Sequence, residues 1–60
     1  MSNFIKLPTD GDGTLWFNID RIIAINEERG IVYVSNGAGQ DVFILTDEGM
    51  SELIEVIQDE

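Results

Sequence analysis

The sequence predicts a small α+β domain spanning residues 1–60, an antiparallel β-meander of about five short strands followed by one C-terminal amphipathic helix. Three observations lead to this prediction. The apolar residues, 43% of the chain, are rich in valine and isoleucine, which favour strands. Turn-forming residues divide the region before Asp47 into short segments, as expected for strands joined by tight connections. From Asp47 onward the apolar residues recur at helical spacing instead.

The first two strands are expected at Phe4–Leu7, which Pro8 closes, and at Thr14–Phe17. Between them lies Thr9–Gly13, a segment of aspartates and glycines typical of turns because glycine tolerates a positive φ. Asn18 is a good cap for a single helical turn that ends at Arg21. The N-terminal third of the chain is therefore predicted to be a hairpin followed by one helical turn.

Three further strands follow, separated by two turns. The first turn is Glu27–Gly30, and the second begins with Asn36-Gly37, a pair strongly favoured in two-strand hairpins. The expected strands are Ile22–Asn26, Ile31–Ser35 and Gln40–Leu45. These segments predict a continuous antiparallel meander.

The final segment is predicted to be a helix with one apolar stripe. Thr46 or Asp47 is a natural N-cap, and acidic residues in the first turn suit the positive end of the helix dipole. Gly49 costs about 1 kcal/mol relative to alanine, so the helix must depend on packing. The stripe, at positions i, i+3, i+4 and i+7, consists of Met50, Leu53, Ile54 and Ile57.

The central strands are expected to be apolar on both faces, although one helix covers only one face. Simple alternation places Ile23 and Ile25 opposite Ile22 and Ala24. A second apolar face is hidden if the sheet curls into a small barrel or pairs with another copy. Because a domain of this size has a marginal core, we expect a homo-oligomer. The alternating pairs in the other two strands are Val32 and Val34 against Ile31 and Tyr33, and Phe43 and Leu45 against Val42 and Ile44.

Several segments together resemble one family of very short bacterial and phage-encoded proteins. They are Phe4–Leu7, the turn ending in Gly13, Asn18–Ile22, Val32–Gly37 and the acidic helix Glu48–Ile57. The pattern is similar to the small flagellar-operon proteins of the FlbD-like (SwrD) type and their prophage relatives. The chain departs from that family at Ile19, where a proline is common, and in having fewer basic residues. The resemblance implies a non-enzymatic accessory protein and supplies no catalytic residue.

Composition excludes several classes of function. Twelve carboxylates against three basic residues give a formal charge of −9, and the chain has no cysteine and no histidine. Disulfides, Cys/His zinc sites and histidine-activated nucleophiles are thereby excluded, and direct nucleic-acid binding is disfavoured. Apolar runs of at most four residues predict no membrane insertion. We expect a cytoplasmic protein that is not an enzyme and that needs no metal or cofactor.

Two groups of residues are candidates for interaction. Trp16 is expected on the side opposite Leu15 and Phe17, and Trp16 and Tyr33 are therefore candidate interface residues, although aromatic residues in strands more often lie in the core. The other group is an acidic stripe on the helix with spacings of 4, 3 and 4, formed by Glu48, Glu52, Glu55 and Asp59. Such a stripe is either a solvated face or a docking surface for a basic partner.

The sequence thus favours a non-catalytic, acidic protein-interaction module that acts as a homo-oligomer. One alternative is a phage-type inhibitor whose acidic surface blocks a basic site on a host or defence protein. A second alternative is an oligomer that binds or sequesters a small ligand between protomers, in which case Lys6, Arg21 and Arg29 from several copies would contact an anion.

Overall fold

The computed structural model describes residues 3–59 and confirms the α+β architecture. Within these residues a hairpin comes first, a single turn of 3-10 helix (η1, Ile19–Arg21) follows, and the chain ends in one α-helix (α1, Asp47–Gln58). The strands are β1 (Phe4–Pro8), β2 (Thr14–Asn18), β3 (Ile22–Asn26), β4 (Ile31–Ser35) and β5 (Gln40–Ile44). All lie within one residue of the predicted ranges; Leu45, predicted as the end of the last strand, lies just outside it.

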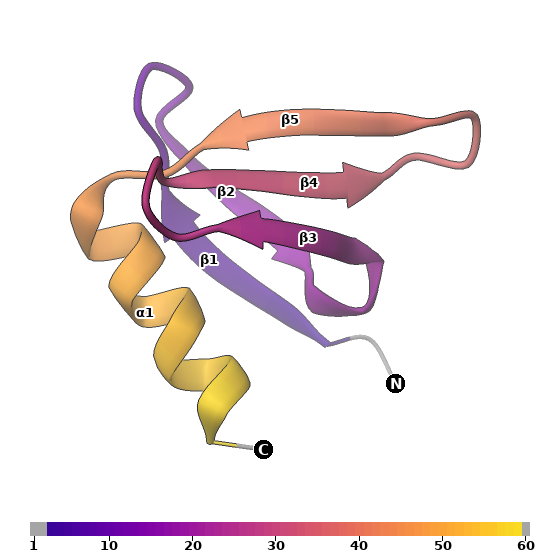
Figure 1. The fold of residues 1–60 in the computed structure, drawn as a ribbon. Helices are drawn as coiled ribbons and strands as arrows, with labels where there is room; N and C mark the ends of the chain where they lie inside the picture. The colour runs from indigo at the N-terminus through magenta and orange to yellow at the C-terminus, as the bar shows by residue number, and fades with distance from the viewer. Residues whose placement is uncertain (1–2, 60) are drawn as a thin grey trace.

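The five strands form two antiparallel sheets. β1 pairs with β2, while β3, β4 and β5 form a separate sheet in that order, and the two sheets overlap with the hairpin behind the three-stranded sheet (Figure 1). One bridge between Thr9 and Leu45 joins them, supported by a hydrogen bond of 2.8 Å from the amide of Asp10 to the carbonyl of Ile44. The sheets are not closed, so the barrel considered from the sequence does not form.

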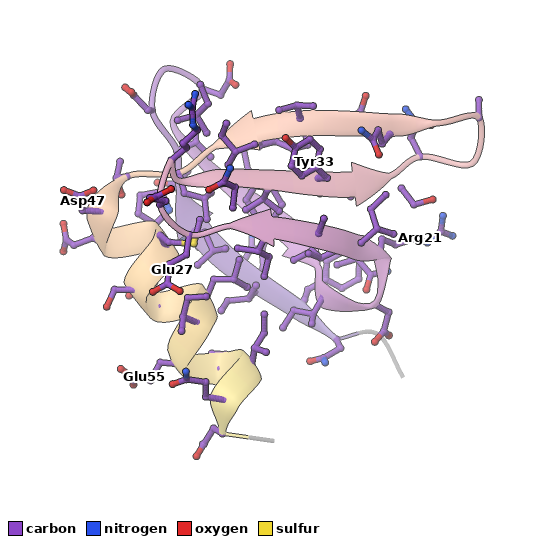
Figure 2. All side chains as sticks on the ribbon, in the orientation of Figure 1. Arg21, Glu27, Tyr33, Asp47 and Glu55 are labelled. Atoms are coloured by element: carbon purple, nitrogen blue, oxygen red, sulfur yellow. The ribbon has the colours of Figure 1, made fainter. Side chains whose placement is uncertain are left out.

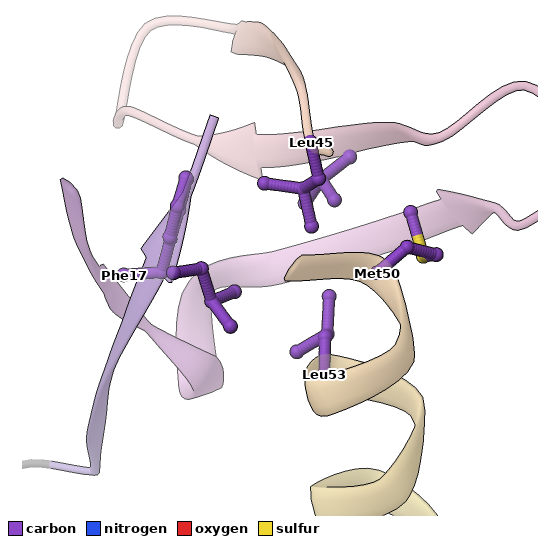
Figure 3. Close-up of a cluster of buried hydrophobic side chains, with 6 residues drawn as sticks. Phe17, Leu45, Met50 and Leu53 are labelled. Carbon is purple, nitrogen blue, oxygen red and sulfur yellow. The ribbon is translucent and has the colours of Figure 1, made fainter. Parts of the chain in front are cut away.

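The core lies between the two sheets and the first half of α1. Its buried residues come from β1, β2, β4, the segment after β5 and α1, and Figure 3 shows them converging. The rings of Phe17 and Phe43 meet edge to face at 5.3 Å between centroids, which ties the hairpin to β5. The buried hydrophobic residues are Leu7, Phe17, Val32, Leu45, Met50 and Leu53.

Simple alternation is wrong for β3, because a bulge interrupts it. Ile22 pairs with Val34 and Ala24 pairs with Tyr33, so Ile23 is an extra residue without a partner. After the bulge Ile25 returns to the same face as Ile22, and both pack against the core. Ile23 and Ala24 are exposed instead. An extra residue in one strand shifts the side-chain alternation by one position, which explains the difference.

Helix α1 is fixed at its start by a cap and by close contact with β1. The Thr46 side chain accepts a hydrogen bond of 3.0 Å from the amide of Gly49, as predicted for an N-cap. A Cβ atom at Gly49 would lie 2.5 Å from the carbonyl oxygen of Pro8, so only glycine permits this approach. Further along, the predicted stripe weakens: Met50 and Leu53 are buried, Ile54 is partly buried and Ile57 is 38% exposed.

Candidate interaction surfaces

The outward side of the three-stranded sheet, here called the outer face, follows directly from the strand register. Ala24, Tyr33 and Val42 form one row across the strands, and Asn26, Ile31 and Ile44 form the next. The third row is the pair Ser35 and Gln40 near the β4–β5 turn. Because side chains alternate along a strand, these residues point away from Val32 and Phe43, which face the core.

The outer face is apolar and carries no charge among the residues that the structure describes. Val42 is 54% exposed and Ile44 is 48% exposed, whereas Tyr33 and Ile31 are partly buried by their neighbours. The eight outward positions contain no Asp, Glu, Lys or Arg, although a quarter of the whole chain is charged. Asp41 is the charged residue of the three-stranded sheet, and it lies on the opposite side to the outer face, in register with Val34; the other charged residues that the structure describes lie in the turns, in η1, in the hairpin, on α1 and at its C-cap.

The hairpin also has an outward side, here called the hairpin face, built around Phe4, Lys6 and Trp16. Lys6 pairs with Trp16 across the strands, and its Nζ atom lies 5.8 Å from the centroid of the indole ring. Trp16 is 66% exposed and Phe4 is 51% exposed, while Phe17 beside it is buried. The expected orientation of Trp16, opposite Leu15 and Phe17, is thus what the fold produces.

Trp16 and Tyr33 do not share a surface. The inner sides of the two sheets meet at Phe17 and Phe43, so the hairpin face and the outer face point away from each other. A single partner surface therefore contacts one of the two aromatic residues, and the candidate interface from the sequence separates into two surfaces.

A third surface is an acidic groove between α1 and the β3–β4 turn, about 460 Å³ in volume. Its base includes the apolar residues Leu45, Met50 and Ile54. Figure 2 shows Glu27 from the turn on the same side of the molecule as Asp47 and Glu55 from the helix. The acidic residues that line the groove are Glu27, Glu28, Asp47 and Glu55, and Arg29 is the one basic residue among the lining residues.

The predicted acidic stripe is exposed along its whole length. Glu48, Glu52 and Glu55 lie on α1, and Asp59 follows the helix as its C-cap residue, donating its amide to the carbonyl of Glu55 at 3.1 Å. Of these four, only Glu55 also lines the groove. The sequence could not place Glu27 and Glu28 near this stripe, because a turn distant in the chain brings them there.

The three basic residues do not converge within one chain. Arg21 and Arg29 lie beyond opposite ends of β3, a five-residue strand of roughly 17 Å. Figure 2 shows Arg21 at the end of the sheet far from Glu27. Lys6 lies on the hairpin face above the indole ring of Trp16. An anion site built from these residues therefore requires several copies, as the sequence interpretation assumed.

A fourth surface, which sequence reasoning missed, is an apolar groove along β3. It is about 320 Å³ in volume, and its lining residues are Ile19, Ile22, Ile23, Ala24, Ile25 and Ile57. It lies at the bulge, since the exposed residues Ile23 and Ala24 line it together with Ile57 of α1, which is 38% exposed. The uninterrupted apolar run Ile22–Ile25 was the available indication in the sequence.

Comparison with known proteins found no match to a family model, a curated protein or a solved structure. The resemblance to FlbD-like proteins consequently stays a prediction. Between residues 3 and 59 no three acidic side chains cluster closely enough to hold a metal ion. The same part of the chain contains no helix with the length and apolar character needed to cross a membrane.

Proposed function

We propose that this protein is a non-catalytic, cytoplasmic interaction module that self-associates through the outer face. The observation that carries the proposal is the absence of charge from that face, within residues 3–59 of a chain with a formal charge of −9. Large apolar side chains on a surface that excludes charge are typical of a region that another protein covers.

A second copy is the partner that fits this face best. Two chains of charge −9 repel each other wherever their acidic surfaces approach. Face-to-face contact of the two outer faces keeps Val42 and Ile44 against apolar atoms, while α1 and the hairpin stay on the far sides. A twofold contact of this kind also supplies a self-complementary surface. Screening of the remaining repulsion should make the association stronger, not weaker, as salt is added.

The test is to place a charge on the outer face without disturbing the core. Val42→Asp changes a residue that is 54% exposed, so the chain should stay folded while the apolar contact acquires a buried charge. Ala38→Asp, in the exposed β4–β5 turn, adds the same charge off the face. Sedimentation or native mass spectrometry should show a multimer for the original chain and Ala38→Asp, and a lower mass for Val42→Asp. A multimer unaffected by Val42→Asp would contradict the proposal.

A second candidate function is favoured by the acidic groove. Four carboxylates around an apolar base suit the aliphatic stem and cationic head of a lysine or arginine side chain. This geometry supports the alternative of an inhibitor that occupies a basic site on another protein. Its affinity should fall with added salt, opposite in direction to self-association. Glu55→Gln should weaken such binding, whereas Asp12→Asn, in the β1–β2 turn, should not.

A further inference from the structure

The apolar groove along β3 has the size and the apolar lining to receive a large aromatic side chain. The groove is lined by five isoleucines and Ala24. Its volume, about 320 Å³, is at the lower end of the range found for small-molecule sites, about 300–1,000 Å³. A single large aromatic side chain is an occupant of suitable size.

Trp16 is the most exposed large hydrophobic residue that the structure describes, at 66%. It belongs to the hairpin face and is not among the residues that line the groove, so a chain does not fill its own groove with it. Tryptophan is also the residue type that most often dominates the energy of an interface when a pocket receives it. The molecule thus presents a protruding aromatic residue and an unfilled apolar groove on different surfaces.

We propose that the groove receives Trp16 of a second copy, in a head-to-tail contact between the hairpin face of one chain and β3 of the next. This inference extends the proposed self-association and adds a contact of another kind. The two contacts involve different copies, because the hairpin face and the outer face point away from each other. Burial of one indole contributes about 150–250 Å² of surface to the head-to-tail contact.

The charges near the two surfaces are complementary. Lys6 is the charged residue of the hairpin face, and it lies beside the indole that enters the groove. Asp20 follows the groove residue Ile19 directly and Asp59 lies two residues after Ile57, and both are exposed; Arg21, directly before Ile22, is also exposed. Lys6 of one copy therefore approaches a rim with more negative than positive groups, on a chain of charge −9. Lys6 therefore gives the hairpin face a positive charge beside Trp16, which favours its approach to a second acidic copy.

The geometry has a consequence for assembly. Contact between two different surfaces is not self-complementary, so each added chain leaves one Trp16 and one groove free. Such contacts close into a ring or continue as a filament, whereas contact between two outer faces ends at a dimer. The two kinds of contact are separable by mutation, because Val42 lies on the outer face and does not line the groove.

The test uses two complementary variants, both carrying Val42→Asp to remove the outer-face contact. Trp16→Ala removes the aromatic residue and keeps the groove, whereas Ile23→Asp places a charge in the groove and keeps Trp16. Both residues are more than half exposed, so both chains should fold, which circular dichroism checks. Each variant alone should be monomeric, and an equimolar mixture should give a species of twice the chain mass and no larger one.

Tryptophan fluorescence supplies a second readout, because Trp16 is the only tryptophan. In the mixture only the Ile23→Asp chain contains it, and its emission should shift to shorter wavelength when the Trp16→Ala chain is added. If the mixture shows neither the emission shift nor a 1:1 species, the inference is overturned. It is also overturned if the Ile23→Asp chain alone already emits at the shorter wavelength, because Trp16 would then be shielded without a partner's groove. Ile57→Asp is a second groove variant if Ile23→Asp does not fold. The Val42→Asp chain with Trp16 and the groove intact tests the outer face separately, because it should have a lower mass than the original multimer and still form head-to-tail species.

Discussion

The two faces of strand β4 carry similar residues and have different surroundings. Val32 and Val34 face the core, where Val32 is fully buried against the hairpin and α1. Ile31 and Tyr33 alternate with them on the outer face, where no element of residues 3–59 covers them. Within residues 3–59 the three-stranded sheet is covered by one twelve-residue helix, about 18 Å long, and one hairpin, and both lie on the inner side. The difference shows that the strands contain more apolar surface than this chain can cover.

The inner and outer faces of the three-stranded sheet should differ most in how much stability the protein loses when a charge is added to each. Val32→Asp places a carboxylate where the side chain has no exposure to water, and it should cost more than about 4 kcal/mol. That is as large as the stability that a core of this size commonly supplies, about 3–5 kcal/mol, so the chain should unfold. Val42→Asp should keep a cooperative thermal transition by circular dichroism. Equal transitions for the two variants would show that the inner and outer faces are not distinct.

Local chemistry made most of the fold predictable. Pro8, the glycines of the first turn, Asn18 and Asn36-Gly37 each act on the backbone within a few residues, so the strand boundaries followed from them. Asn36 illustrates this: its side chain accepts a hydrogen bond of 3.0 Å from the amide of Ala38, which fixes the turn independently of the rest of the molecule. Thr46 acts in the same local way at the start of α1.

Features that depend on tertiary packing were not predictable. The run Ile22–Ile25 is apolar at every position, so it contains no period from which a bulge could be inferred. The exposure of Trp16 was predictable because its neighbours alternate, but its separation from Tyr33 depends on how two sheets pack. The helical period likewise assigned Ile57 to the core, whereas Ile57 is 38% exposed and lines the apolar groove beside β3.

A smaller effect should test how closely the inner side is packed. Gly49→Ala would gain about 1 kcal/mol on an isolated helix, because alanine favours helix formation. Here the added Cβ atom meets the Pro8 carbonyl at 2.5 Å, so α1 must move away from β1. The net result should be a loss of about 1–3 kcal/mol in the free energy of unfolding, measured by urea denaturation.

Ser51→Ala is the matched control, since Ser51 is exposed on the same helix. It should raise stability by a few tenths of a kcal/mol through propensity alone. If Gly49→Ala lowers the free energy of unfolding and Ser51→Ala raises it, the close contact between α1 and β1 is the cause of the loss. A gain for both would mean that α1 is not held against Pro8.

The smallest effect concerns the exposed end of α1, which faces the solvent as the outer face does. The last turn contains no basic residue, and Asp59 caps the end where the helix dipole favours a cation. Asp59→Lys should therefore raise the free energy of unfolding by about 0.3–1 kcal/mol, and the gain should shrink in high salt. Asp12→Lys makes the same charge change in the β1–β2 turn, away from the helix. If both substitutions raise the free energy of unfolding equally, the destabilising effect of Asp59 comes from the net charge of the chain. If Asp59→Lys raises it more, the effect comes from the position of Asp59 at the helix end. The second result would mean that the acidic stripe is retained at an unfavourable position, which supports a role in contacting a basic partner over a role in solubility alone.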